Sequence, residues 1–129
     1  LLIDDSYNAN IDSVTAALVA LKQLAEGRRK VFVAGQMLEL GDTSEQVHTR
    51  TAELAHEAGV SDILAIGEAA RPLARRAREL GIATTYVDDA DQALAMIDQI
   101  VTDFDAVLVK GSHSSGAWRI ADYLKEVRA

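Results

Sequence analysis

The sequence predicts an α/β domain with a doubly wound, mostly parallel, Rossmann-like sheet and helices on both faces. Strand-like and helix-like segments alternate five times along the chain, which is typical of parallel strands joined by right-handed crossovers. Four of the five strand-like segments are continuous apolar runs, which indicates strands covered on both faces. The 129 residues suffice for one such domain and leave no room for two.

The predicted strands are short and mostly aliphatic. They cover residues 1–3, 31–34, 63–66, 84–87 and 106–109. After each strand, apolar residues recur at helical spacing, which predicts a helix with one buried stripe. The stripes run from Val14 to Leu24, from Val47 to Ala58, from Ala70 to Leu80, from Ala90 to Val101 and from Ala117 to Val127.

Residues with known capping preferences stand at the predicted helix ends. Thr43, with a glutamine three residues later, has the pattern of a capping box. Gly59 and Gly81 stand where a C′ glycine belongs. Either Asp88 or Asp89 can cap the fourth helix.

Composition argues against several classes of function. The chain has no cysteine, which excludes disulfides and thiolate metal ligands and suits a cytoplasmic protein. Its formal net charge of −7 argues against a nucleic-acid partner, and the basic run from Arg71 to Arg78 is expected to be a solvated helix face. The chain contains no apolar run of about 18 residues, the length that a membrane-spanning helix needs. The first residue is Leu1 rather than Met, as expected for a piece of a longer protein.

Ligands of open α/β sheets bind outside the carboxyl ends of the strands. The segments after the first, second and fifth predicted strands, 4–10, 35–42 and 110–116, are polar or rich in glycine. These three segments are therefore the candidate ligand-binding edge.

The segment 4–10 reads Asp-Asp-Ser-Tyr-Asn-Ala-Asn. Its carboxylates can accept hydrogen bonds from ribose hydroxyls, its amides can both donate to and accept from an adenine edge, and its tyrosine offers a flat face for a base. The alternative is structural: Asn10 or Asp12 caps the first helix while Asp4 and Asp5 meet water. Both interpretations remain open at this point.

The other two segments differ in what they can bind. The segment 35–41 reads Gly-Gln-Met-Leu-Glu-Leu-Gly and is followed by Asp42, so it lacks the lysine and Ser/Thr of a P-loop. The segment 110–116 reads Lys-Gly-Ser-His-Ser-Ser-Gly and could hold a carboxylate or phosphate through backbone N–H groups and Lys110. The alternative interpretation of the segment 110–116 is structural: a capped helix start with a solvated lysine.

The histidines do not predict a metal site. His48 and His56 are eight residues apart on the second predicted helix, and His113 stands alone in a loop. No triad spacing with serine and aspartate is apparent, although triads form in space rather than in sequence.

A stand-alone receiver-like signalling or binding module is the second hypothesis. Receiver domains share the five-fold β/α pattern, with paired acids after the first strand, as at Asp4 and Asp5, and a lysine after the fifth, as at Lys110. The phosphoacceptor aspartate expected after the third strand is missing, because Gly67 and Glu68 stand there. A plain dinucleotide-binding domain is also disfavoured, because Gly-x-Gly-x-x-Gly is absent.

In order and spacing, the chain resembles the C-terminal domain of the Mur ligases. The matching motifs are Asp5–Asn10, Gly35–Gly41, His48 and Val109–Ser112, and the resemblance covers essentially the whole chain. The Tyr-Asn-Ala-Asn run is similar to that of the family member that joins D-Ala-D-Ala to UDP-MurNAc-tripeptide. The resemblance implies one Mur ligase C-terminal, substrate-closing domain over residues 1–129, with an N-terminal UDP-binding domain and a central ATPase domain absent from this chain.

The resemblance also implies an activity for the whole enzyme. ATP and Mg²⁺ would activate the tripeptide carboxylate as an acyl phosphate, which the amine of D-Ala-D-Ala attacks during cytoplasmic peptidoglycan synthesis. The P-loop, the Mg²⁺ ligands and a carbamylated lysine belong to the central domain. The present domain is therefore expected to hold no catalytic residue and no metal, to bind no cofactor alone, and to be inactive by itself. Its expected role is to close over the ATP site and help bind the dipeptide.

Site roles carry over by position. The resemblance implies nucleotide-binding roles for Asp4, Asp5, Tyr7, Asn8 and Asn10. It implies substrate-binding roles for Gln36, Met37, Leu38, Glu39, His48, Lys110, Ser112 and Ser114, with His48 supporting the segment 35–41. The sequence departs from the family pattern at Ile11 in place of proline, Gln36 in place of aspartate and His113 in place of arginine. The last two departures bear on acceptor binding and leave the nucleotide-side motif intact.

Overall fold

The computed structural model describes residues 1–6 and 10–127, and its five strands form one sheet in which all neighbouring strands are parallel. They are β1 (Leu2–Asp5), β2 (Lys30–Gly35), β3 (Asp62–Ile66), β4 (Ala83–Val87) and β5 (Ala106–Lys110). Their order across the sheet is β1-β5-β2-β3-β4. The predicted parallel sheet is confirmed, and each strand lies within two residues of its expected bounds.

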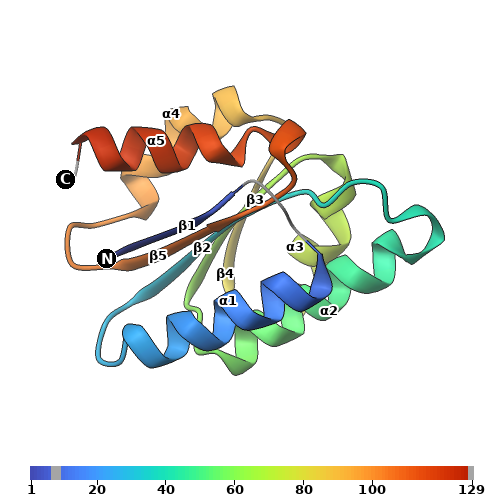
Figure 1. The fold of residues 1–129 in the computed structure, drawn as a ribbon, viewed down its shortest axis with the longest axis horizontal. Helices are drawn as coiled ribbons and strands as arrows, with labels where there is room; N and C mark the ends of the chain where they lie inside the picture. The colour runs from blue at the N-terminus through green and yellow to red at the C-terminus, as the bar shows by residue number, and fades with distance from the viewer. Residues whose placement is uncertain (7–9, 128–129) are drawn as a thin grey trace.

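Helices cover both faces of this sheet (Figure 1). One face carries α1 (Ile11–Leu24), α2 (Ser44–Glu57) and α3 (Arg71–Glu79), and the other carries α4 (Ala90–Ile100) and α5 (Ala117–Val127). Short 3-10 turns precede three of them: η1 (Gly41–Thr43), η2 (Glu68–Ala70) and η3 (His113–Ser115).

Two apolar clusters fill the two interfaces between sheet and helices. Phe32 packs in the cluster beneath α1, α2 and α3, whereas its neighbour Val33 packs in the cluster beneath α4 and α5. Successive strand residues point to opposite faces, so a strand covered on both sides must be apolar at every position. The continuous apolar runs of the sequence are explained in this way. Leu24 and Val127, expected to continue their stripes, are exposed, because each lies in the last turn of its helix.

The helix ends confirm most of the predicted caps. Gly59 and Gly81 have φ angles of 82° and 85°, as expected for C′ glycines, and Asp89 accepts a hydrogen bond from Gln92 N–H at 2.9 Å.

The predicted capping box at Thr43 is wrong. Thr43 ends η1 with a φ of −87° and a ψ of −5°, and its hydroxyl donates to the Leu40 carbonyl at 2.7 Å. Since η1 runs directly into α2, no extended residue is available to act as the cap.

The position of β5 sets the geometry of the ligand edge. Because β5 lies between β1 and β2, the three polar segments of the sequence follow three neighbouring strands. The chain leaves β1 and β2 toward helices on one face and leaves β5 toward α5 on the other (Figure 1). Such a divergence is a topological switch point, where open α/β sheets form their binding crevice.

The strand order also contradicts the receiver-like alternative. Flavodoxin-like receivers have the order 2-1-3-4-5, which differs from the order found here. None of the helices in the described part of the chain is long and apolar enough to cross a membrane.

Candidate functional site

The loops after β1, β5 and β2 meet at one edge of the sheet. In the strand register, Asp5 of β1 and Ala34 of β2 both pair with Lys110 of β5. The end of β5 is thus flanked by the start of the loop 6–10 on one side and by the loop 35–41 on the other. The described parts of the three segments that the sequence indicated separately therefore lie at one edge of the sheet.

Lys110 joins β5 to the end of β1 and to α1. Its side chain is only 1% exposed, and its ammonium donates to Asp5 Oδ2 at 2.9 Å and to Ser13 Oγ at 3.1 Å. The alternative of a solvated lysine is therefore wrong, because β1 and α1 cover the lysine. Although its backbone belongs to the segment 110–116, its charge is directed toward Asp5 of β1 and Ser13 of α1.

Asp4 is turned the other way, toward α5. It accepts a hydrogen bond from Ser6 Oγ at 2.6 Å and pairs with the ammonium of Lys125. Burial raises the pKa of Asp4, but the hydrogen bonds from Lys125 and Ser6 outweigh burial, so this pKa lies below its ordinary value. The interpretation in which Asp4 and Asp5 meet water holds only for Asp5, whose side chain is half exposed, and both carboxylates also pair with a lysine.

Asn10 is the N-cap of α1. Its Oδ1 accepts from Ser13 N–H at 2.9 Å, and Ser13 Oγ accepts from Asn10 N–H at 3.2 Å, which completes a capping box. The capping interpretation is confirmed for Asn10 rather than for Asp12. On the side chain of Asn10, the cap uses only the oxygen atom, and a nucleotide-binding role for Asn10 stays a prediction. Tyr7 and Asn8 lie outside the described residues.

The loop 35–41 is fixed from below by His48 of α2. Met37 N–H donates to His48 Nε2 at 3.0 Å, and His48 Nδ1–H donates to the Ser44 carbonyl at 2.8 Å. The ring is fully buried. Burial lowers the pKa of His48, and the hydrogen bond to Ser44 offsets this only in part. The contact agrees with the expected support of the loop by His48, whereas its effect on a substrate stays a prediction.

Gln36 links three strand ends. Its backbone N–H donates to the Ile66 carbonyl at 2.8 Å and its carbonyl accepts from Ser112 N–H at 3.1 Å. Its side-chain Oε1 accepts from Ala69 N–H of η2 at 3.0 Å. A Cβ atom at Gly67, where φ is 100°, would lie 2.5 Å from Gln36 Cδ. The Gln36 amide therefore makes a structural contact with η2.

The loops 35–41 and 110–116 pack as one unit. Leu38 N–H donates to Ser112 Oγ at 2.9 Å, and a Cβ atom at Gly111 would lie 2.8 Å from Gly35 Cα. Between these glycines, the buried Ser115 hydroxyl accepts from Ala117 N–H at 3.2 Å. Only glycine allows this close approach of the two backbones.

Residues 1–113 match the family model described as "Mur ligase, glutamate ligase domain". The chain belongs to the Mur ligase family. The predicted resemblance and the α/β fold are thereby confirmed.

Several relatives of this Mur ligase domain are named UDP-N-acetylmuramoyl-tripeptide–D-alanyl-D-alanine ligase. The protein from Mycobacterium leprae is 36% identical over 95% of this chain, and that from Escherichia coli is 34% identical over 98%. In both, the match spans 27% of the relative's length. The present chain therefore corresponds to about a quarter of those proteins.

Solved structures agree with these relatives. A structure of MurF from Acinetobacter baumannii superposes with a TM-score of 0.82 at 29% identity, covering 97% of this chain and 28% of that one. MurF from Thermotoga maritima, solved in complex with ADP, superposes with a TM-score of 0.72 at 22% identity, covering 97% of this chain and 28% of that one. At this identity, the second match supports the fold alone.

Within this Mur ligase domain, the predicted acceptor residues differ in exposure. Met37 is buried as an anchor, while Leu38, Glu39 and Ser114 are exposed. Glu39 has a φ of 63°, a left-handed conformation that is uncommon for a residue with a side chain. The exposed tip of the loop 35–41 is thus Leu38 and Glu39, beside Ser112.

Sequence reasoning missed two residues of the site. Ser13 supports both Asn10 and Lys110, and its place three residues after Asn10 was an available signal. Trp118 stacks on His113, with ring centroids 5.5 Å apart and planes 8° apart. No motif in the sequence marks Trp118, because the stacking depends on how the chain turns between η3 and α5.

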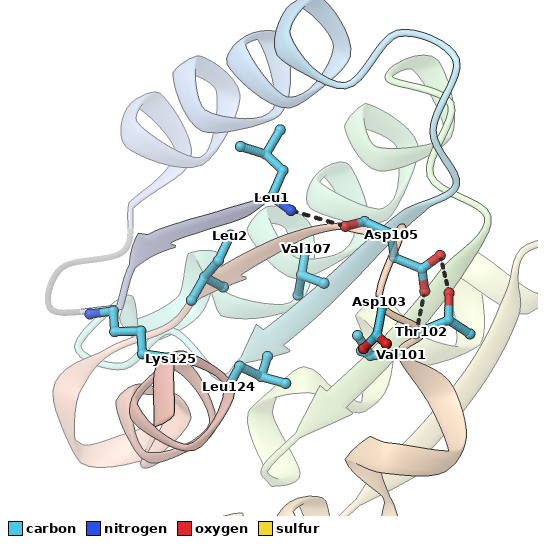
Figure 2. Close-up of a pocket in the computed structure, with 9 residues that line it drawn as sticks. All are labelled: Leu1, Leu2, Val101, Thr102, Asp103, Asp105, Val107, Leu124 and Lys125. Atoms are coloured by element: carbon cyan, nitrogen blue, oxygen red, sulfur yellow. Dashed lines mark hydrogen bonds between the residues drawn. The ribbon is translucent and has the colours of Figure 1, made fainter. Parts of the chain in front are cut away.

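An apolar hollow of about 230 Å³ lies at the opposite edge of the sheet (Figure 2). Its walls include Leu2, Val107 and Leu124, near the amino ends of β1 and β5. The Asp105 carboxylate there already accepts from Thr102 N–H and Oγ1 at 2.8 and 2.9 Å. In residues 1–6 and 10–127, no group of three or more His, Asp or Glu could hold a metal ion.

Proposed function

We propose that this chain is the C-terminal domain of an ATP-dependent ligase that adds D-Ala-D-Ala to UDP-MurNAc-tripeptide in cytoplasmic peptidoglycan precursor synthesis. Relatives with that name match 95% or more of this chain at 34–36% identity. The domain closes over the ATP site and helps to bind the dipeptide. By itself it is inactive, because the ATPase domain that supplies ATP and Mg²⁺ chemistry is a separate part of such a ligase.

The observation that carries this proposal is the adjacency of the loops after β1, β5 and β2. The loop after β1 offers the carboxylate of Asp5 and the amide of Asn10 to a ribose and a base, with Tyr7 and Asn8 between them in sequence. The loops 35–41 and 110–116, which pack against each other, form the acceptor side. A nucleotide and an amine acceptor would therefore lie on the two sides of Lys110.

The described residues provide binding and positioning rather than bond-making groups. Lys110 and His48 are buried and bonded within the protein, so neither is placed as a general acid or base. ATP, when bound to the whole enzyme, supplies the phosphoryl group that activates the tripeptide. The contribution of this domain is to hold the nucleotide and the dipeptide in the geometry that favours attack.

A chimaeric enzyme tests the proposal. We would fuse residues 1–129 to the N-terminal and central domains of the Escherichia coli relative and measure ADP release with and without D-Ala-D-Ala. We expect dipeptide-dependent ADP release from the fusion and none from this chain alone. A folded fusion that binds ATP but shows no dipeptide dependence would refute the proposed function.

A further inference from the structure

The hydrogen bonds of His48 determine its protonation state. Met37 N–H is a donor, so His48 Nε2, 3.0 Å away, must carry a lone pair. The other ring nitrogen lies 2.8 Å from the Ser44 carbonyl, an acceptor, so Nδ1 carries the proton. Only the neutral Nδ1–H tautomer satisfies both partners. A second proton on Nε2 would place two donors against each other in a fully buried site.

We propose that His48 is a positioning residue that fixes the loop 35–41 only while its ring is neutral, so that acidification releases this loop and weakens binding of the amine acceptor. The part concerning the acceptor rests on the proposed function. The part concerning the loop rests on the two hydrogen bonds alone.

The contact acts on the residues that form the exposed face of the loop. Met37 is buried, and the next residue, Leu38, is exposed and bonded through its N–H to Ser112 Oγ. Loss of the bond between Met37 and His48 would therefore free the backbone just before Leu38 and Glu39. The loop would then be held mainly by the hydrogen bond between Leu38 and Ser112, which joins the loops after β2 and β5.

Among residues 1–6 and 10–127, no acidic side chain makes a hydrogen bond or ion pair with His48 that would compensate its protonation. Among the described residues, one charged side chain on the neighbouring elements is fully buried, Lys110 of β5, and its ammonium is paired with Asp5. Other charged side chains on these elements lie at the surface of the protein. They include Asp12 of α1, Glu39 of the loop, Asp42 of η1, Glu45 of α2 and Arg75 of α3. Among described residues, the pKa of His48 is set by burial, which lowers it, and by the Ser44 carbonyl, which raises it. The hydroxyl of Ser44, 3.3 Å from Nδ1, is neutral.

NMR on this chain tests the positioning role without any ligase activity. Ring ¹⁵N shifts should show an unprotonated Nε2 in His48 at pH 7.5. The hydrogen-exchange protection of the Met37 amide should fall as the pH is lowered from about 6.5 to the lower pKa of His48 in the folded state. The fall should be about tenfold per pH unit, because His48 binds a proton when the loop is open and excludes it when the loop is closed. Protection of Val33 in the core of β2 should fall less. Equal losses at Met37 and Val33 would overturn a local role.

Three variants separate the ring nitrogen from the bulk of the side chain. His48→Gln places an amide oxygen near Nε2 without a titrating group, so protection of Met37 should become independent of pH. His48→Ala removes the acceptor, and protection should be low throughout. His56→Gln is the matched control, because His56 is exposed on the same helix, and it should behave as the original chain does. A pH dependence that persists in His48→Gln would refute the proposal, even if His48→Ala does not fold.

The chimaeric ligase tests the consequence for the acceptor. Below about pH 6.5, KM for D-Ala-D-Ala should rise more in the unmodified fusion than in His48→Gln, while KM for ATP changes equally in both. A KM for the dipeptide that follows the same pH profile in both enzymes would refute the acceptor part of the proposal. An inactive fusion would count against the proposed function, and the NMR result would still decide the role of His48.

Discussion

Lys110 and Asp5 form an ion pair whose two members differ sharply in exposure. The lysine Nζ lies 2.9 Å from the aspartate Oδ2, yet the lysine side chain is 1% exposed and the aspartate side chain is 50% exposed. The ammonium depends on the protein for its partners, whereas the carboxylate can return to water. The two halves of this pair should therefore tolerate substitution unequally.

Asp5→Ala should destabilise the domain more than Lys110→Met. Removing the carboxylate takes an ionised partner away from a buried ammonium, which costs about 3 kcal/mol. Removing the lysine leaves a carboxylate that regains water, so we expect a loss of about 1 kcal/mol. Urea unfolding of the original chain, the two single variants and the double variant measures the difference. The double variant should be more stable than Asp5→Ala, and a larger loss in Lys110→Met would contradict this account of the pair.

Substitutions at Asn10 should separate capping from nucleotide binding. Asn10→Ala removes the capping oxygen and should lower the free energy of unfolding by about 1 kcal/mol. Asn10→Asp keeps that oxygen and adds a charge that is favourable at a helix N-terminus, so its stability should stay near that of the original chain.

In the chimaeric ligase, Asn10→Asp should raise KM for ATP roughly fivefold to tenfold, the effect of one lost hydrogen bond. KM for the dipeptide should not change. An unaltered KM for ATP in this well-folded variant would restrict Asn10 to its structural role.

Gly67→Ala should cost more stability than Gly59→Ala. Both glycines have positive φ angles, of 100° and 82°, but a Cβ at Gly67 would meet Gln36 Cδ at 2.5 Å while one at Gly59 meets nothing within 4 Å. We expect losses of about 3 and about 1 kcal/mol respectively, measured by thermal unfolding. Adding Gln36→Ala to Gly67→Ala should recover part of the loss. No recovery would show that the backbone, rather than the Gln36 contact, sets the cost.

The pair between Asp4 and Lys125 should contribute to stability at neutral pH and lose that contribution in acid. Because the pKa of Asp4 is lower in the folded state than its ordinary value, the contribution is complete above about pH 4 and disappears as the pH falls through the folded-state pKa. Lys125 is more than half exposed, so Lys125→Met should cost at most about 1 kcal/mol near neutral pH. Urea unfolding from pH 3 to 7 should show the two proteins converging at the acid end. A constant difference would argue against this pair.

Much of the fold could be predicted because its signals are local. Apolar runs such as 31–34 are explained by burial on both faces, and Gly59 and Gly81 end helices through their own backbone freedom. The capping box predicted at Thr43 rested on a local pattern, and it is wrong because η1 already gives that residue helical dihedral angles. Whether a short 3-10 turn precedes a helix depends on how the preceding loop is held.

The candidate site was predicted as three segments and a family motif, and of its internal contacts only the support of the loop 35–41 by His48 and the cap at Asn10 were expected. Lys110 was open to a solvated interpretation, yet β1 and α1 bury it. Gln36 was expected on the acceptor side, yet its amide bonds to Ala69. These outcomes depend on neighbours that are distant in sequence, such as Asp5, which is 105 positions from Lys110. No local pattern encodes such a contact.

The sequence by itself determined the α/β class, the number and phase of the elements and the family motifs from Asp5 to Asn10 and from Gly35 to Gly41. These properties follow from the polarity and backbone preferences of nearby residues. Only the tertiary structure decided that β5 lies between β1 and β2. That order brings the three polar strand ends together, buries Lys110 against Asp5 and places a neutral His48 beneath Met37. The physical reason is that strand order is selected by packing over the whole sheet, and burial and hydrogen-bond partners follow from it.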